Sequence, residues 1–274
     1  MKYAGFWIVL LLLLTDLNQS FAQGDLMIYP RRLVFGSSQR SMDVTLANSG
    51  TDSSTYALSW KNYRMTSSGQ FTEITEPDSG QYLADEILRF FPREVTLAPG
   101  ESQKVKVQRI SNRQLPEGEY RSHLEFRSAK PMDATTPSAS EEQDQIQTQL
   151  NMHLAITIPV IMEIGSITAQ VELKNVTWIA SDSKSLQLRF DIHRSGKKSS
   201  YGDFTLTHRS ADGKMTQVGL VKGVAVYAPI KKRSYSVPVT IPAGVTINEG
   251  ELILEYISQT KRKEILASLV VPLK

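Results

Sequence analysis

The chain has 274 residues, of which 41% are hydrophobic and none is a cysteine. This length allows two domains with an apolar core each, and the lack of cysteine excludes a disulfide-stapled scaffold and thiol chemistry. The formal net charge of +3 is too small to indicate a nucleic-acid partner, which would require a concentrated basic surface.

The first 22 residues have the pattern of a secretory signal peptide. Lys2 precedes the apolar run Phe6–Leu14, and Ser20 and Ala22 are the small residues that a cleavage site needs. The apolar run is too short to span a bilayer, and no later segment is apolar enough to do so. We therefore expect an exported protein whose mature chain begins at Gln23 and has no membrane-spanning segment.

Residues 23–164 are predicted to form an all-β domain. Apolar residues alternate with polar ones in short runs separated by turn signals, and no segment has a helical period. In one run Trp60 follows Tyr56 and Leu58, which predicts that its ring fills the centre of a sandwich. Together with an opening strand from Leu26 to Phe35, the runs give about seven strands, the number in an immunoglobulin-like sandwich.

The end of this domain has the most distinctive pattern. A polar, acidic segment, residues 128–149, has no apolar periodicity and is expected to be a disordered loop. The run that follows is expected to form an edge strand that ends at Pro159, because proline is tolerated in sheets mainly at edges and bulges. An exposed apolar edge is an aggregation liability, so the pattern indicates a strand kept for a partner. The large apolar side chains on one face of this strand are Leu150, Met152, Leu154, Ile156 and Ile158.

Residues 165–274 are predicted to form a second all-β domain, with Gly165 as the hinge. Asp212-Gly213 is a hairpin signal between two alternating runs. The run Ile247–Tyr256 is expected to pair with Ile265–Val271 across a further turn. The whole chain is therefore predicted to be all-β, with two immunoglobulin-like sandwiches.

No motif indicates catalysis, a metal or a cofactor, and we expect the protein not to be an enzyme. The histidines stand singly along predicted strands, without metal-ligand spacing, and each is expected to be an outward or half-buried strand residue. No nucleophile elbow or phosphate-binding glycine loop is present. The basic runs Lys197-Lys198 and Lys231–Arg233 are expected at solvated turns and strand ends. The four histidines are His123, His153, His193 and His208.

Two blocks in the first half of the chain have the order and spacing of a known family. They are Pro30–Phe35 with Ser41–Asn48, and Arg89–Arg93 with Leu97–Gln103 and Leu115–Arg121. On these residues the chain resembles the periplasmic pilus chaperones (PapD-like) of the chaperone–usher pathway. The resemblance covers nearly all of residues 23–164, whereas the second half matches in size, position and all-β character. It implies a boomerang of two immunoglobulin-like sandwiches, located in the periplasm.

The resemblance also implies a function. Such chaperones bind pilin-like subunits, whose sandwich lacks its last strand, by lending the last strand of their own first domain. They then deliver the subunits to an outer-membrane usher for pilus assembly. In this chain the lent strand corresponds to Leu150–Ile158. Arg32 falls on the position of an arginine that grips the subunit's terminal carboxylate. The lysine that assists it is replaced by Pro159, so the second cation is open, with Arg31 and Arg109 as candidates.

Other functions fit the same fold. An exported structural or adhesive surface module would have two such sandwiches but would need neither an apolar edge strand nor a polar loop beside it. A relative of the chaperones that no longer serves a pilus would keep both features. A hydrolase would require dispersed residues to converge in space. The edge strand and the loop favour the chaperone.

Overall fold

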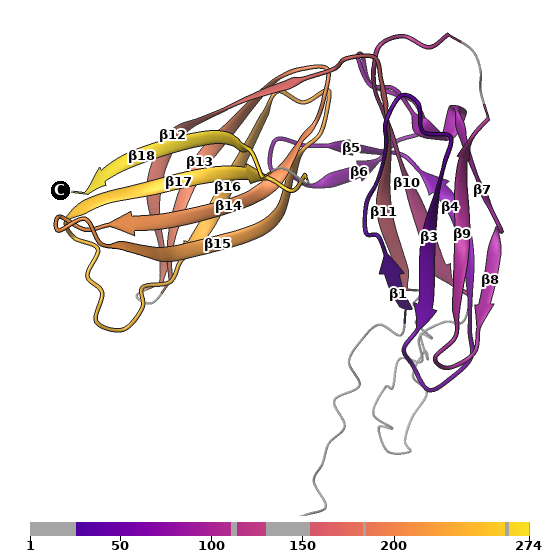
Figure 1. Ribbon diagram of the computed structural model, residues 1–274, viewed down its shortest axis with the longest axis horizontal. Helices are drawn as coiled ribbons and strands as arrows, with labels where there is room; N and C mark the ends of the chain where they lie inside the picture. The colour runs from indigo at the N-terminus through magenta and orange to yellow at the C-terminus, as the bar shows by residue number, and fades with distance from the viewer. Residues whose placement is uncertain (1–25, 111–113, 130–153, 183–184, 261–262, 274) are drawn as a thin grey trace, which may run out of the picture.

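The computed structural model describes residues 26–110, 114–129, 154–182, 185–260 and 263–273. Strands dominate, with one short 3-10 helix, η1 (Ala84–Glu86), and no helix of the described residues is long and apolar enough to cross a membrane. Figure 1 shows two elongated β bodies that meet at one end, with their long axes at a steep angle. The predicted class, all-β with two immunoglobulin-like sandwiches, is confirmed. The predicted signal peptide and most of the predicted polar loop lie outside the described residues, together with Leu150 and Met152.

The N-terminal sandwich packs a four-stranded sheet against a five-stranded sheet. The first has the order β1-β3-β9-β7 and the second the order β2-β11-β10-β4-β8. A separate hairpin, β5-β6, projects from this sandwich toward the other body (Figure 1). The strands are β1 (Leu26–Tyr29), β2 (Leu33–Phe35), β3 (Ser41–Asn48), β4 (Ser54–Lys61), β5 (Tyr63–Met65), β6 (Phe71–Glu73), β7 (Leu88–Phe91), β8 (Glu94–Leu97), β9 (Ser102–Arg109), β10 (Gly118–Ser128) and β11 (Ala155–Ile164).

Alternation of apolar residues places one face of each long strand in the core of this sandwich, as the sequence predicts. Val44 of β3, and Leu124 and Phe126 of β10, are buried there. Trp60 departs from the prediction, because its ring lies partly buried at the margin of the core, edge-on to Phe90 at 5.3 Å between ring centres.

The opening segment is two strands rather than one. β1 pairs with β3 in the four-stranded sheet, whereas β2 pairs in parallel with β11 in the other sheet. The chain crosses between the sheets at Pro30-Arg31-Arg32, where the proline has no N–H to give to a ladder. The predicted continuous strand from Leu26 to Phe35 is therefore wrong, and Arg32 lies in the link between two strands.

The last strand of the N-terminal sandwich ends later than predicted, and the first residues of the predicted strand, 150–153, lie outside the described residues. β11 runs from Ala155 to Ile164 and passes through Pro159, which is opposite His123 of β10. On the side of β11 that faces β2, pairing covers Val160–Met162 and does not include Pro159. No described strand on that side therefore requires an N–H from the proline. The predicted end of the strand before Pro159 is therefore wrong.

The C-terminal sandwich packs a three-stranded sheet, β12-β13-β16, against a four-stranded sheet, β15-β14-β17-β18. Asp212-Gly213 lies in the turn between β14 and β15, and β17 pairs with β18, so both of these predictions are confirmed. Stacked rings fill the core, with the ring of Phe204 at 4.4 Å from that of Tyr256. The strands are β12 (Ala169–Asp182), β13 (Ser185–Gly196), β14 (Ser200–Arg209), β15 (Met215–Val226), β16 (Lys232–Val239), β17 (Gly250–Ser258) and β18 (Ile265–Leu273).

A nearly buried carboxylate supports the irregular part of β12. Asn175 has a positive φ of 55° where the pairing of β12 with β13 shifts register. Its side-chain amide donates to Asp191 at 2.8 Å, and Asp191 also accepts from Ser234 at 2.6 Å and pairs with Lys232 at 2.9 Å. Burial by itself would raise the pKa of Asp191, but these donors lower it to about 2. Lys232, predicted to be solvated, is therefore part of a structural ion pair.

We expect Asp191→Asn to remove an acid-dependent part of the stability. Because the folded-state pKa lies below the ordinary value of 3.8, the carboxylate stabilises the fold above that pH, and this stability is lost as the pH falls toward 2. In the wild-type protein the loss is about 2 kcal/mol. Urea unfolding at about pH 6 and about pH 2.5 measures it. Equal losses in the wild type and the variant would contradict the assigned role of Asp191.

The chain passes from one core to the other between Ile164 and Ala169. Gly165 has a φ of +81°, and a Cβ there would lie 2.4 Å from the side chain of Glu117, so both backbone conformation and space favour glycine. The predicted domain bounds, 23–164 and 165–274, stay a prediction that agrees with this change of core.

Candidate functional site

The first part of β11 has an open backbone edge. On one side β11 pairs with β10 along its whole length. On the other side β2 pairs with Val160–Met162, so among the described residues Ala155–Pro159 have no neighbouring strand there. We call Ala155–Pro159 the open edge. The backbone N–H and C=O groups of such an edge can pair with a further strand.

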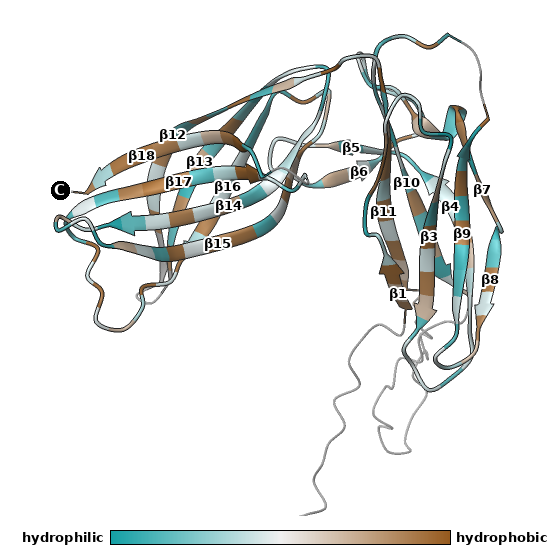
Figure 2. Ribbon diagram, in the orientation of Figure 1, coloured by the Kyte–Doolittle hydropathy of each residue, from teal (hydrophilic) through white to brown (hydrophobic). Residues whose placement is uncertain are grey.

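The alternating side chains at this edge become more buried along the strand. Leu154, just before β11, is 37% exposed, Ile156 is partly buried against the core, and Ile158 is 3% exposed. They share one face, because Val160 and Met162 continue the alternation and are buried in the same core. In Figure 2 brown segments mark apolar residues along β11. Ile158 is therefore not at the surface, and among the described residues of the predicted face Leu154 and the partly buried Ile156 are the ones that solvent reaches.

Arg32, the predicted carboxylate anchor, lies in the angle between the two sandwiches. Its Nη1 donates to the hydroxyl of Tyr227 at 2.8 Å, and its guanidinium carbon lies 4.4 Å from the ring centre of Tyr201. Both tyrosines belong to the C-terminal sandwich. In the described parts of the chain no carboxylate forms an ion pair with Arg32. Its half-buried charge is therefore held by aromatic groups rather than by an anion.

A second guanidinium group lies against the same tyrosine. Arg121 of β10 is 3% exposed, and its guanidinium carbon is 4.3 Å from the centre of the Tyr227 ring, compared with 5.3 Å for Arg32. Its Nη2 donates to the backbone carbonyl of Tyr63 at 3.3 Å, whereas its Nε and Nη1 are buried without an acceptor among the described residues. Burial lowers the pKa of Arg121, and the charge of Arg32 also lowers it. We call the two guanidinium groups with the Tyr227 ring the arginine site.

The ring of His123 packs beside the arginine site. It is 4% exposed and packs edge-on to Tyr63, at 4.9 Å between ring centres, and to Tyr227, at 6.4 Å. Burial lowers the pKa of His123 to about 3, and the charges of Arg121 and Arg32 contribute to this shift. The imidazole is therefore neutral near pH 7, and the positive charge of the site comes from the two arginines.

The sequence signal of this site is an alternation of ionisable residues along β10. Glu119, Arg121, His123 and Glu125 lie on the face opposite the core, and all four are nevertheless buried. The β5-β6 hairpin and the C-terminal sandwich cover this face, where Glu119 accepts from the N–H of Ser199 at 2.7 Å. Arg121 could not be predicted as a site residue from the sequence, because an outward position on a strand normally faces solvent and the covering elements are distant in the chain.

Charged pairs join the two sandwiches beside this face. Lys197 pairs with Glu117 at 3.2 Å, and Lys198 pairs with Glu163 at 2.8 Å. Both carboxylates belong to the N-terminal sandwich and both lysines to the turn after β13. Lys197 and Lys198 lie in a solvent-accessible turn, as predicted, with 61% and 38% of their side chains exposed, and they also connect the sandwiches through these ion pairs.

The other predicted site residues are only partly brought together. Arg31 is exposed in the link between β1 and β2, and Arg109 lies on β9 in the four-stranded sheet. Neither is the residue that shares Tyr227 with Arg32, since that residue is Arg121.

The histidines differ from one another in burial. His123 and His208 are buried, which contradicts the predicted outward or half-buried position, whereas His193 is half-buried as predicted. His153 lies outside the described residues. Within the described ranges no group of three or more His, Cys, Asp or Glu side chains could hold a metal ion.

Comparison with known proteins finds likeness in fold without likeness in sequence. No protein-family model and no curated protein matches the chain. The class 5 fimbriae chaperone CfaA is 14% identical, with 91% of this chain and 99% of that chain covered and a TM-score of 0.46. The CsuC–CsuE chaperone–subunit complex, from the archaic chaperone–usher Csu pili of Acinetobacter baumannii, matches with 10% identity, 92% and 100% coverage and a TM-score of 0.45. The periplasmic chaperone SfaE matches with 10% identity, 90% and 98% coverage and a TM-score of 0.45. At these values the likeness concerns the arrangement of strands, and function has to be argued from this chain's own residues.

Proposed function

We propose that this protein is a non-enzymatic periplasmic chaperone of pilus assembly, which binds pilin-like subunits by lending them the start of β11 and delivers them to an outer-membrane usher. The observation that carries the proposal is the open edge, Ala155–Pro159, next to the exposed side chain of Leu154. Soluble β proteins usually protect such an edge with charges, a bulge or a covering segment. The signal peptide predicted for residues 1–22 supports export of the chain to the compartment where such subunits fold.

In the proposed complex a strand of the subunit pairs with the open edge and continues the five-stranded sheet. Leu154 and Ile156 then enter the gap in the subunit's core, which is how strand addition combines backbone pairing with side-chain pockets. Complete burial of two fully exposed side chains of this size is worth about 3–6 kcal/mol, and the gain here is a part of that, because Leu154 is 37% exposed and Ile156 is already partly buried. Leu150 and Met152, which continue the alternation, are proposed to extend this contact. Ile158 stays in the core of the N-terminal sandwich and is left out of the proposed contact.

The terminal carboxylate of the subunit is proposed to bind at the arginine site. A carboxylate accepts two parallel N–H groups from a guanidinium fork, and the Nε and Nη1 of Arg121 lack acceptors among the described residues. The second cation beside Arg32 then comes from β10 rather than from the position of Pro159. An anion would also offset the cost of burying two like charges against one tyrosine, which supports this assignment.

Replacement of the accessible Leu154 and the partly buried Ile156, Leu154→Asp with Ile156→Asp, is expected to abolish subunit capture. Two carboxylates cannot enter an apolar groove without a large desolvation cost, and the apolar contacts are lost as well. The tagged chain is produced in its native host, and the small β-rich proteins that co-purify from the periplasm are identified and quantified by mass spectrometry. We expect the amount of captured subunit to fall at least about a hundredfold.

The matched control is Leu220→Asp with Val270→Asp on the C-terminal sandwich, where these side chains are 43% and 48% exposed. This variant should capture the same subunit as the wild type. Circular dichroism and thermal unfolding report whether each variant is folded, and Leu154→Asp alone serves if the double variant is not. A folded donor variant that retained normal capture would contradict the proposal and favour a surface module without chaperone activity.

A further inference from the structure

The β5-β6 hairpin lies in the angle between the two sandwiches and covers the arginine site (Figure 1). Its two strands have three residues each, and an isolated hairpin of this size is not stable in water. Contacts from both sandwiches hold it in place. The N–H of Ser234 donates to the carbonyl of Ser67 at 2.8 Å, and Met65 is buried in one cluster with Ile161 and Tyr227.

The hairpin occupies the space that an anion would need. The backbone carbonyl of Tyr63 takes the hydrogen bond of Arg121, and the Phe71 ring lies 5.6 Å from that of His123 and 6.0 Å from that of Tyr227. A neutral carbonyl is a weaker acceptor than a carboxylate for a guanidinium group. Phe71 is 47% exposed, so solvent reaches the outer side of this cover. A carboxylate that reached Arg121 would therefore compete well with the hairpin.

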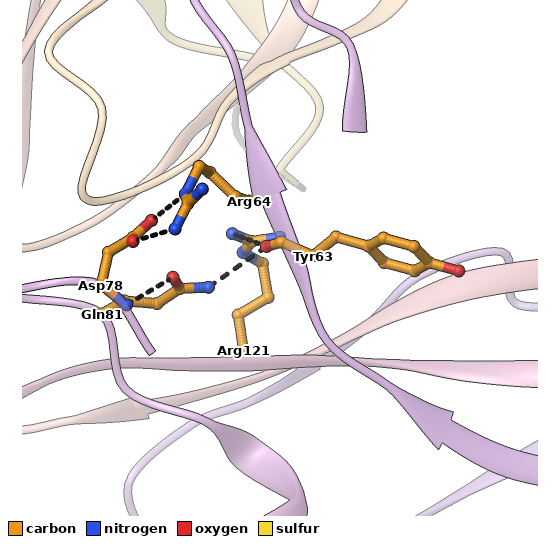
Figure 3. A network of polar contacts seen from close by, with 5 residues as sticks. All are labelled: Tyr63, Arg64, Asp78, Gln81 and Arg121. Atoms are coloured by element: carbon orange, nitrogen blue, oxygen red, sulfur yellow. Dashed lines mark hydrogen bonds and ion pairs between the residues drawn. The ribbon is translucent and has the colours of Figure 1, made fainter. Parts of the chain in front are cut away.

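A chain of polar contacts fastens the hairpin to the neighbouring loop (Figure 3). Arg64 forms a two-point ion pair with Asp78, and the N–H of Asp78 donates to Gln81 at 3.3 Å. Gln81 in turn donates to the Tyr63 carbonyl at 3.1 Å. The Arg64–Asp78 pair is solvent-accessible and therefore screened by salt and weak. The Tyr63 carbonyl accepts from both Gln81 and Arg121, so it stays paired on release of Arg121 if the side chain of Gln81 follows the hairpin.

We propose that the β5-β6 hairpin is a displaceable gate, which is closed over the arginine site in the free protein and moves aside when a carboxylate reaches Arg121. This inference rests on the proposed function, in which the arginine site receives the terminal carboxylate of a subunit. The closed hairpin disfavours free small anions. A subunit already docked along the open edge presents its carboxylate at a high effective concentration and can displace the hairpin.

Phe71→Ala tests the gate because it removes the largest side chain of the cover. The apparent affinity for a carboxylate is the intrinsic affinity reduced by the fraction of molecules with the gate open. Loss of a half-buried aromatic ring should raise that fraction about tenfold. In the mature full-length chain, acetate is titrated at constant ionic strength, and the Nε–H signal of Arg121 in NMR spectra reports its binding. Deuterium exchange of the Ser234 amide reports opening, since this N–H bonds to the hairpin.

We expect Phe71→Ala to speed exchange at Ser234 and to tighten acetate binding, each about tenfold. The matched control is Phe91→Ala. This phenylalanine is 76% exposed on β7, in the four-stranded sheet of the N-terminal sandwich, and its loss should change neither measurement. Asp78→Asn breaks the exposed ion pair and should give smaller changes of the same sign, about threefold. It serves as the test if Phe71→Ala does not fold.

The outcomes separate the gate from the site. Faster exchange at Ser234 with unchanged acetate affinity would overturn the gate, and so would unchanged exchange in both hairpin variants. Both results leave a carboxylate site at Arg121 intact. An Arg121 signal that does not respond to acetate in any of the proteins would overturn the carboxylate site and the gate together. The proposed role of the open edge in subunit capture would then still be tested separately by the variants of Leu154 and Ile156.

Discussion

Arg121→Met is expected to stabilise the free protein and to weaken subunit capture at the same time. In the free protein two nitrogen atoms of the Arg121 guanidinium are buried without an acceptor among the described residues, and the group also faces the charge of Arg32. An apolar side chain of similar length removes the desolvation cost of this charge. Comparable replacements of buried charges stabilise proteins by about 1–4 kcal/mol. The midpoint of urea unfolding should therefore rise.

Capture should change in the opposite direction, because the variant leaves the subunit's carboxylate in a buried site without its guanidinium partner. Truncation of one member of a buried charge pair costs about 2–5 kcal/mol of binding free energy, a loss of roughly thirty- to several-thousandfold in affinity. Calorimetry with the subunit identified by co-purification measures this loss. A variant that is less stable and binds the subunit normally would contradict both the free-state and the bound-state roles of Arg121.

Arg194→Met is the matched control for this experiment. Arg194 is 4% exposed, but its guanidinium donates to the carbonyls of Ile230 at 3.0 Å and of Gly196 and Lys198 at 2.8 Å. Methionine would leave these carbonyls without their donor, so this variant should lose about 2–3 kcal/mol of stability. Two buried arginines that give opposite results would show that unpaired charge, rather than arginine burial itself, determines the effect at Arg121.

His123→Phe is expected to remove most of the loss of stability that the N-terminal sandwich undergoes between pH 7 and pH 4. The folded-state pKa of His123 is lowered to about 3 from the ordinary value of 6.5. Its unprotonated ring therefore favours the fold above pH 6.5, and this contribution is lost as the pH falls from 6.5 toward 3. For the wild type this amounts to about 3 kcal/mol at about pH 4. Phenylalanine keeps an aromatic ring against Tyr63 and Phe71 without a proton to bind.

The measurement uses urea unfolding followed by the fluorescence of Trp60, in a Trp178→Phe background that leaves no tryptophan in the C-terminal sandwich. The slope of stability against pH should flatten in the His123→Phe protein between about pH 6.5 and about pH 4. The Asp191 contribution acts below this range, since it is lost between the ordinary value of 3.8 and about 2. Parallel slopes for wild type and variant would contradict the burial of an unprotonated histidine at this position.

Periodicity in the sequence was sufficient for the class of fold and for much of the strand pairing. Runs with a period of two predicted both sandwiches, the hairpin at Asp212-Gly213 and the pairing of β17 with β18, because these features depend on neighbouring residues and on one face of a strand. Local pattern did not predict that β11 continues through Pro159, because a strand tolerates proline where no neighbouring strand needs its N–H, and the sequence does not show which side has a neighbour. Alternation also predicted one continuous strand where the structure has β1 and β2, since it carries no information on which sheet a strand enters.

The alternation predicted an apolar face on the strand that is proposed to be lent, but it could not predict which residues of that face are buried in the protein's own core. Leu154, Ile156 and Ile158 look alike in sequence, and their burial differs because Ile158 reaches the core of the N-terminal sandwich, whereas Ile156 and Leu154 lie progressively farther toward its end. The resemblance to pilus chaperones marked Arg32 as the candidate carboxylate anchor. It did not predict the neighbours of this side chain, Tyr201 and Tyr227, which come from the C-terminal sandwich.

The local pattern of this chain was enough to specify two β sandwiches and a strand with one apolar face, since hydrophobic burial acts on periodicity that can be read along the chain. Which ionisable residues became buried depended on how the sandwiches and the β5-β6 hairpin pack together. Arg121 and His123 occupy outward strand positions that solvent would normally cover, and the second sandwich and the hairpin exclude that solvent. The arginine site exists because Tyr227 packs against Arg32, which is 195 residues away in the sequence, and against Arg121, and no local pattern encodes such contacts.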